Sequence, residues 1–514
     1  MTATDFLTIL GLALAVWALI PKKERNFVML FFSKRQIIFF GISLMFLHYL
    51  FAFDWLLENW FPWLSVFTSE KGIPSSTWAY LFSLVLIGAP VLQVMFGFFS
   101  STRRQELISL YNTLLKEDDI DLLVEYINKY HISDIQAYLK GLSYLPEKEN
   151  IDMILRRRTE KDEAFDKLIK PRRMQFAANV YGRILQSDDF INKAASKYPE
   201  LFATAFAGME SEKAANPDLV KLYIENIFES KNQSFVKELK IVNDSESSIE
   251  SIFNDYDIPI LYGLLSHTKT AFQNAVWYPV GEKGVKSLKY DSEQQVFLQK
   301  KYDSALESEL WNQKIYIAIV YFDYMVRETI FKNNKWHMWL FYYRSFTKEL
   351  IEIIPSSNDY DGDTERPSFT HSLIVDMIWI MRGWIELAKK RNVKHRVIDT
   401  IKCLGDCLDT ICAAPEDKVS SAFKKRQVNL IISLWFEYSY HADNKAVKLA
   451  RDWMEMMFLN PKGVDSTYQP VSNDYKEVMR EAWRDFDKIP YQMHGENGSV
   501  KDFTDKIIVP LGIN

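Results

Sequence analysis

The stretch from Trp78 to Phe99 most constrains what this chain can fold into. It contains no charged residue over 22 positions and is followed by the basic pair Arg103-Arg104. As an α-helix it would extend roughly 30 Å at about 1.5 Å per residue, which matches the hydrocarbon core of a bilayer. After Arg104 the composition becomes that of a soluble protein. The sequence therefore predicts a membrane-spanning helix at about 78–99.

Two earlier stretches have a similar character. Residues 37–57 are apolar and aromatic apart from His48 and Asp54, and residues 3–20 are apolar apart from Asp5 and two threonines. The first stretch is short for a complete crossing. We therefore expect two to three transmembrane helices, the alternative being two spans preceded by an amphipathic start.

The distribution of Lys and Arg predicts the orientation. Five basic residues separate the first two stretches and only Lys71 lies between the second and the third. Basic loops remain in the cytoplasm, so we expect a multi-pass protein of the inner (plasma) membrane with its N-terminus outside and its large C-terminal part cytoplasmic. Residues 1–104 carry 8 basic and 5 acidic side chains, a charge of +3. Because the whole chain carries -5, the remainder carries -8, which disfavours broad binding to nucleic acid.

The remaining 410 residues have helical periodicity. Apolar residues recur at intervals of three and four in many segments, including 118–142 and 427–440. The expected fold class is all-α, with the transmembrane bundle (1–104) followed by an irregular helical array in two lobes (105–241 and 252–514). Residues 315–320 and 378–385 are apolar but are flanked or interrupted by charges, so we expect core helices there.

The exception to this periodicity is residues 276–288. Their sequence, VWYPVGEKGVKSL, predicts a hairpin or an irregular loop.

No stretch predicts a metal, a cofactor or a strong catalytic set. Cys403, Cys407 and Cys412 lie within ten residues, but no neighbouring histidine completes a metal site, so we expect buried thiols on a core helix. Asp359, Asp361 and the residues around them lack the distal glutamate of a calcium loop and are expected to form a solvated turn.

Arg366 and His371 have the Arg-x4-His spacing found in helical ribonucleases of the HEPN class. The resemblance implies that His371 would act on the scissile phosphate while Arg366 stabilises its charge. Here a proline follows the arginine, where a polar residue is usual, and a chain with this many Arg and His residues contains about one such pair by chance.

The predicted spans contain polar and helix-breaking groups. His48 and Gln93 lie at membrane depth, and Pro90 frees a backbone carbonyl in the third span. These groups either line a seam or a wet path between helices or only hold the helices together. Three helices cannot enclose an aqueous pore, so a channel would require a homo-oligomer.

In its layout, with short spans at 3–99 and a helical remainder at 105–514, the chain is similar to membrane effectors of bacterial anti-phage defence, such as those associated with retrons. The resemblance implies a non-enzymatic effector whose cytoplasmic helices bind a protein or ribonucleoprotein partner while its spans disturb the bilayer. No residue role follows from it. The alternatives are a membrane-anchored HEPN-like ribonuclease using Arg366 and His371, and a membrane-tethered scaffold that recruits a cytoplasmic partner.

Overall fold

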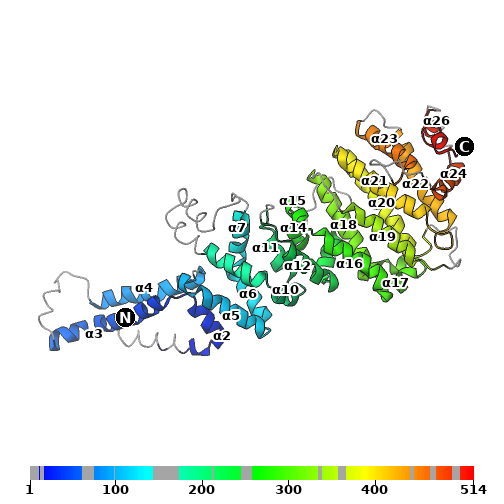
Figure 1. Cartoon of the computed structure of the whole chain (residues 1–514). Coiled ribbons are helices and arrows are strands. Elements are labelled where there is room, and N and C mark those ends of the chain that lie inside the picture. Colours follow the sequence, from blue (N-terminus) through cyan, green and yellow to red (C-terminus); the bar gives the residue numbers. More distant parts are fainter. Residues whose placement is uncertain are drawn as a thin grey trace. The chain divides into compact units, whose positions relative to one another are not determined.

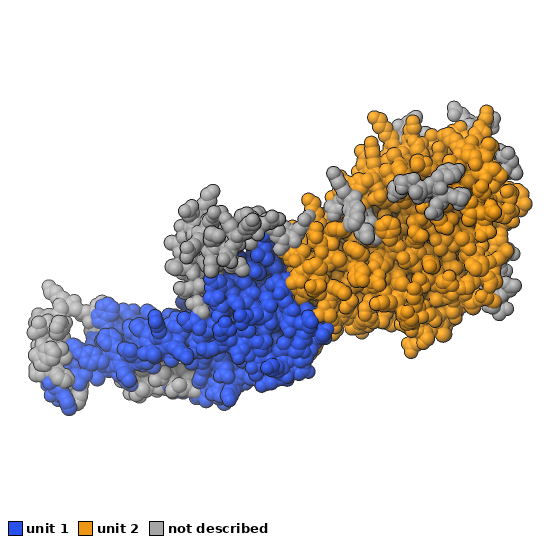
Figure 2. Space-filling view, in the orientation of Figure 1, with its two compact units in different colours: residues 1–194 blue, residues 195–514 orange. Residues whose placement is uncertain are grey.

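The structure is a computed structural model that forms two compact units, Met1–Ala194 and Ala195–Asn514 (Figure 2). It describes residues 11, 15, 17–60, 75–97, 99–142, 173–210, 214–244, 257–333, 339–356, 366–439, 445–462, 471–488 and 498–513. Within these ranges the chain forms helices and no strand, and Lys301 and Ser368 make an isolated β-bridge. The predicted all-α fold is confirmed. The predicted lobe boundary at 242–251 lies mostly outside the described residues.

The first unit joins a long helical hairpin to a set of shorter helices (Figure 1). Its elements are α2 (Lys22–Met29), α3 (Lys34–Asn59), α4 (Ser75–Met95), the 3-10 turn Ser101–Arg103, α5 (Arg104–Lys116), α6 (Ile120–Tyr130), α7 (Ile132–Leu142), a π-helical turn (Tyr181–Leu185) and α10 (Asp188–Ala194). The predicted second and third spans correspond to α3 and α4, although α4 ends at Met95 and not at Phe99. Most of the predicted first span, 3–20, lies outside the described residues.

The second unit is a larger helical array (Figure 1). Its elements are α11 (Pro199–Phe206), α12 (Pro217–Glu229), α13 (Gln233–Asp244), α14 (Pro259–Leu265), α15 (Thr268–Gln273), α16 (Trp277–Tyr290), α17 (Ser292–Gln299), the 3-10 segment Ser304–Asn312, α18 (Lys314–Phe331), α19 (Leu340–Ile353), α20 (Phe369–Lys390), α21 (Lys394–Cys412), α22 (Ser421–Ser439), α23 (Lys445–Leu459), α24 (Asn473–Asp485), α26 (Gly498–Phe503), the π-helical turn Thr504–Ile508 and α27 (Val509–Leu511).

The centre of this unit is built on α18 and α20. Nearly every residue of α18 from Ile315 to Ile330 is buried, and Trp384 of α20 is fully enclosed. The charge at Asp323 is accommodated by Arg327 at 2.8 Å and by the indole N–H of Trp384 at 2.6 Å. Residues 315–320 and 378–385 are therefore helices of the protein core, as predicted.

The predicted hairpin or loop at 276–288 is wrong, because Val276 caps α16 and the residues after it lie in this helix. Pro279 occupies the first turn of the helix, where a backbone N–H has no helical partner. A Cβ on Gly281 would lie 2.3 Å from the Tyr342 ring, and one on Gly284 would lie 3.0 Å from Phe346. The glycines therefore allow close packing of α16 against α19, a requirement that local sequence patterns do not reveal.

Gly263 of α14 makes an equally close approach, in this case to the backbone of α11. A Cβ added there would lie 2.3 Å from the carbonyl oxygen of Ala203, and a backbone atom cannot rotate away. We predict that Gly263→Ala lowers the free energy of unfolding by about 1–3 kcal/mol through overpacking. Gly383→Ala is the matched control, because nothing lies within 4 Å of its Cβ and it sits in the interior of α20. The control should be neutral or stabilising by about 0.5–1 kcal/mol. Thermal unfolding of the detergent-purified chain measures both, and equal melting temperatures for the two variants would contradict this packing.

Candidate functional site

The helical hairpin α3–α4 is the first candidate site. The segments Lys34–Phe53 and Thr77–Met95 are long and apolar enough to cross a membrane, and only 11% of each is buried. A core helix of a soluble protein would be mostly buried. Large apolar side chains instead lie exposed on both helices: Ile38, Phe39, Ile42, Met45, Phe46, Leu81, Leu84, Val85, Ile87, Val91, Leu92, Met95.

The two helices meet along a narrow seam. Leu47 and Ala79 are fully buried there, and the hydroxyl of buried Ser83 donates to the carbonyl of Tyr80 at 2.7 Å. The small Ala79 side chain lets the helices approach closely, and Ser83 satisfies its polar group within its own helix. The contact between the two helices is thus mainly apolar.

Gln93 binds the start of α3. Ser33 caps this helix: its hydroxyl accepts from Gln36 N–H at 3.1 Å, and its N–H donates to Gln36 Oε1 at 2.7 Å. Gln36 Nε2 then donates to Gln93 Oε1 at 3.3 Å, and Gln93 Nε2 donates to the carbonyl of Phe31. Gln93 therefore ties the C-terminal end of α4 to the turn before α3.

A cluster of rings lies directly beyond this tie, and we call it the aromatic junction: Phe27, Phe31, Phe99, Tyr126 and Tyr130. Phe27 of α2 stacks on Tyr126 of α6 with ring centroids 3.8 Å apart. Phe31 stacks on Phe99 at 4.2 Å, and both rings also contact Tyr130. The junction thus packs the residues just before α3 and just after α4 against α6.

His131 and Tyr111 support the junction from behind. The His131 ring stacks on Phe99 at 5.2 Å, and its Nε2 shares a hydrogen bond of 2.8 Å with the Tyr111 hydroxyl. Burial, with a smaller contribution from the charge of Arg173, lowers the pKa of His131 to about 3. The imidazole is therefore neutral at physiological pH.

Hydrogen bonds and ion pairs lie around the aromatic junction. Ser100 N–H donates to the carbonyl of Leu30 at 3.3 Å, and Arg103 Nη1 donates to the carbonyl of Met29 at 3.1 Å. Lys23 of α2 forms ion pairs with Glu117 at 2.6 Å and Asp119 at 3.0 Å. Hydrogen bonds thus tie the end of α2 to the segment that follows α4, and ion pairs tie α2 to the residues between α5 and α6.

The other predicted membrane groups have different environments. His48 of α3 is exposed, and none of the residues described here hydrogen-bonds to its imidazole. Pro90 is half-buried in the interior of α4, which continues through it.

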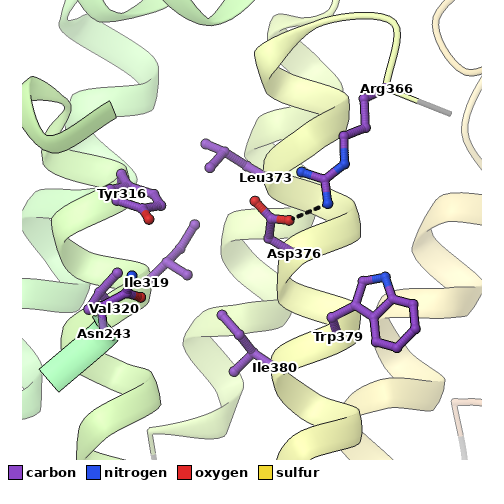
Figure 3. A pocket seen from close by; sticks show the side chains of 9 residues that line it. All are labelled: Asn243, Tyr316, Ile319, Val320, Arg366, Leu373, Asp376, Trp379 and Ile380. Carbon is purple, nitrogen blue, oxygen red and sulfur yellow. Dashed lines mark ion pairs between the residues drawn. The ribbon is translucent and has the colours of Figure 1, made fainter. Parts of the chain in front are cut away.

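The second candidate site is a pocket in the second unit (Figure 3). It has a volume of about 440 Å³ and is lined by Asn243, Tyr316, Ile319, Val320, Arg366, Leu373, Asp376, Trp379 and Ile380. Arg366 pairs with Asp376 at 2.9 Å and donates to the Ser372 hydroxyl at 2.7 Å. Burial raises the pKa of Asp376 to about 6, although Arg366 opposes this shift. The guanidinium is already engaged by two partners, and the walls around the pair are mostly apolar.

His371 does not line this pocket. Its side chain is 2% exposed, and its Nδ1 lies 2.8 Å from the hydroxyl of Ser368, the residue that caps α20. Its ring contacts Phe423 at 5.0 Å, and burial lowers its pKa to about 4. The structure therefore places Arg366 at a pocket and His371 in the core at a helix start. This arrangement does not favour a nuclease pair, which needs an imidazole that can reach a phosphate.

The remaining candidates are the three cysteines and the acidic turn. Cys403, Cys407 and Cys412 are buried free thiols, as predicted. The turn with Asp359 and Asp361 lies outside the described residues. Elsewhere in the described part of the chain, no group of three or more His, Cys, Asp or Glu side chains could hold a metal ion.

Sequence reasoning missed the aromatic junction. Phe27 and Phe31 recur at helical spacing, but their partners lie about 70–100 residues further along the chain. Spacing indicates that a helix has an apolar face and does not indicate what covers it. It also missed Tyr316 and Trp379 in the pocket for the same reason.

No protein-family model, curated protein or solved structure matches the chain.

We predict that Phe27→Ala detaches α2 from α6. Phe27 is 3% exposed, and removal of a buried Phe ring costs about 3–5 kcal/mol. Amide hydrogen exchange in α2 should accelerate by at least about tenfold in the detergent-purified chain. Phe39→Ala is the matched control, because the ring is 62% exposed on α3, and it should leave exchange in α2 unchanged. Equal exchange rates in the two variants would rule out the junction as a stabilising contact.

We predict that His131 makes the first unit sensitive to acid. The unfolded chain binds a proton at His131 below about pH 6.5, whereas the folded unit resists protonation down to about pH 3. Stability is therefore fully present above about pH 6.5 and falls by about 1.4 kcal/mol per pH unit below it. Denaturant unfolding across about pH 5 to 7 measures this slope, and His131→Gln should make it shallower. An unchanged slope would mean that the folded unit does not hold His131 neutral.

Proposed function

We propose that this chain is an inner-membrane effector of a bacterial anti-phage defence system. The α3–α4 hairpin would lie in the bilayer, and the cytoplasmic helices would bind a partner or trigger. The observation that carries the proposal is the hairpin itself: two apolar helices with exposed outer faces, bound at one end to a helical domain through the aromatic junction.

The charges at the two ends of the hairpin support its proposed orientation. Lys34 and Arg35 begin α3, and Arg103 and Arg104 follow α4, so the basic residues gather at the end that carries the junction. Exposed Trp60 and Trp78 lie toward the opposite end, as aromatic residues do at a membrane interface. By the positive-inside rule the junction end faces the cytoplasm.

The junction favours an effector over a passive tether. A tether needs only a flexible connection, whereas here Phe31 and Phe99, which flank the hairpin, pack against Tyr130 of α6. Ring stacking and ion pairs also fix α2, the helix before the hairpin, to α5 and α6. Such a connection can transmit a change in the attached helices to the membrane. A scaffold that recruits a cytoplasmic partner remains the alternative, and it predicts that the hairpin sequence is interchangeable.

The test is membrane potential in bacteria that express the full chain, with and without phage challenge. We expect depolarisation that survives His371→Ala and is abolished when 34–95 is replaced by an unrelated two-span anchor. Activity that persists with the unrelated anchor would support the scaffold. An intact membrane with RNA loss abolished by His371→Ala would support the ribonuclease.

A further inference from the structure

The outward face of α3 differs chemically from that of α4. The side chains exposed on α4 from Leu81 to Met95 are all apolar. On α3 the exposed residues Ile38, Gly41, Met45 and His48 recur every three or four positions, so they lie on one side of the helix. This face, which we call the His48 face, combines a glycine with a hydrogen-bonding side chain.

The free energy of placing the His48 imidazole in the membrane is unfavourable if this face meets only lipid. It lies inside the apolar segment Lys34–Phe53, and no described residue satisfies its imidazole. Polar side chains at membrane depth face other helices or water, because hydrocarbon offers no hydrogen bond. Gly41 lies two helical turns before His48, and a Cβ there would meet nothing within 4 Å. A small residue at such a position lets a second helix approach closely.

A second copy of the chain satisfies these requirements. Neutral imidazole has one N–H donor and one acceptor nitrogen, so two His48 side chains can bond each other across a two-fold axis. The apolar stretch 3–20 of the same chain is less suitable, because its hydrogen-bonding side chains lie toward its two ends: Thr4, Asp5 and Thr8 near its start and Trp17 near its end.

We propose that the chain self-associates in the membrane through the His48 face, with the imidazoles of two copies hydrogen-bonded to each other. The inference rests on the proposed membrane location of the hairpin. One hairpin has too few helices to enclose a water-filled path, so self-association is also what a membrane-disturbing function requires.

The test is disulfide cross-linking of the full chain in its native membranes. Met45→Cys lies on the His48 face with a 76% exposed side chain, and Val85→Cys is the matched control on the outer face of α4, at 66%. The natural cysteines are buried, so background should be low. Oxidation should give a dimer of twice 60.3 kDa with Met45→Cys, at about threefold or more the yield of the control. Adding His48→Leu should lower that yield about threefold, and His48→Gln, which keeps a donor and an acceptor, should restore it.

Alkaline extraction of the same membranes separates the two hypotheses. Release of the protein would contradict the proposed membrane function itself. Retention with equal or no cross-linking at the two positions would overturn the His48 interface alone. A disulfide within one chain between Met45→Cys and Leu10→Cys, without dimer, would assign the face to the first apolar stretch and would also overturn the proposal.

Discussion

Two ring stackings hold the first unit together: Phe27 stacks on Tyr126, and Phe31 stacks on Phe99. The hairpin buries little surface of its own, since only 11% of each apolar segment is buried. Its attachment to α6 therefore comes from Phe31 and Phe99, which pack against Tyr130. Gln93 holds the end of α4 to the turn before α3, and the ion pairs of Lys23 hold α2 beside α5 and α6. Aromatic rings suit this role because each buries a large area in a defined geometry.

The two long apolar helices were predictable because the signal for them is local. A run of about 20 apolar residues identifies a membrane-length helix whatever its partners, and α3 and α4 lie where the composition indicates. The helix α16 shows the opposite case. Its proline and two glycines suggest a turn, but Gly281 and Gly284 serve the contacts with α19, and a single sequence does not contain those contacts explicitly.

The candidate sites were predictable only in part. Gln93 and His48 are polar outliers in apolar runs, so the sequence identifies them, but it does not distinguish the bonded Gln93 from the exposed His48. Arg366 and His371 match a nuclease spacing that equally marks the start of α20, where Ser368 is the cap and His371 lies one turn in. Both interpretations use the same residues, and burial of the imidazole favours the structural role.

The most direct test of this account is the sidedness of the hairpin. A protease site inserted between Trp60 and Ser75 should be cut in spheroplasts by protease added from outside, while the chain after Arg104 stays protected. The cleaved α3 and α4 should remain in the membrane fraction after alkaline extraction. Degradation of the second unit from outside, or release of the uncut chain at high pH, would contradict the account.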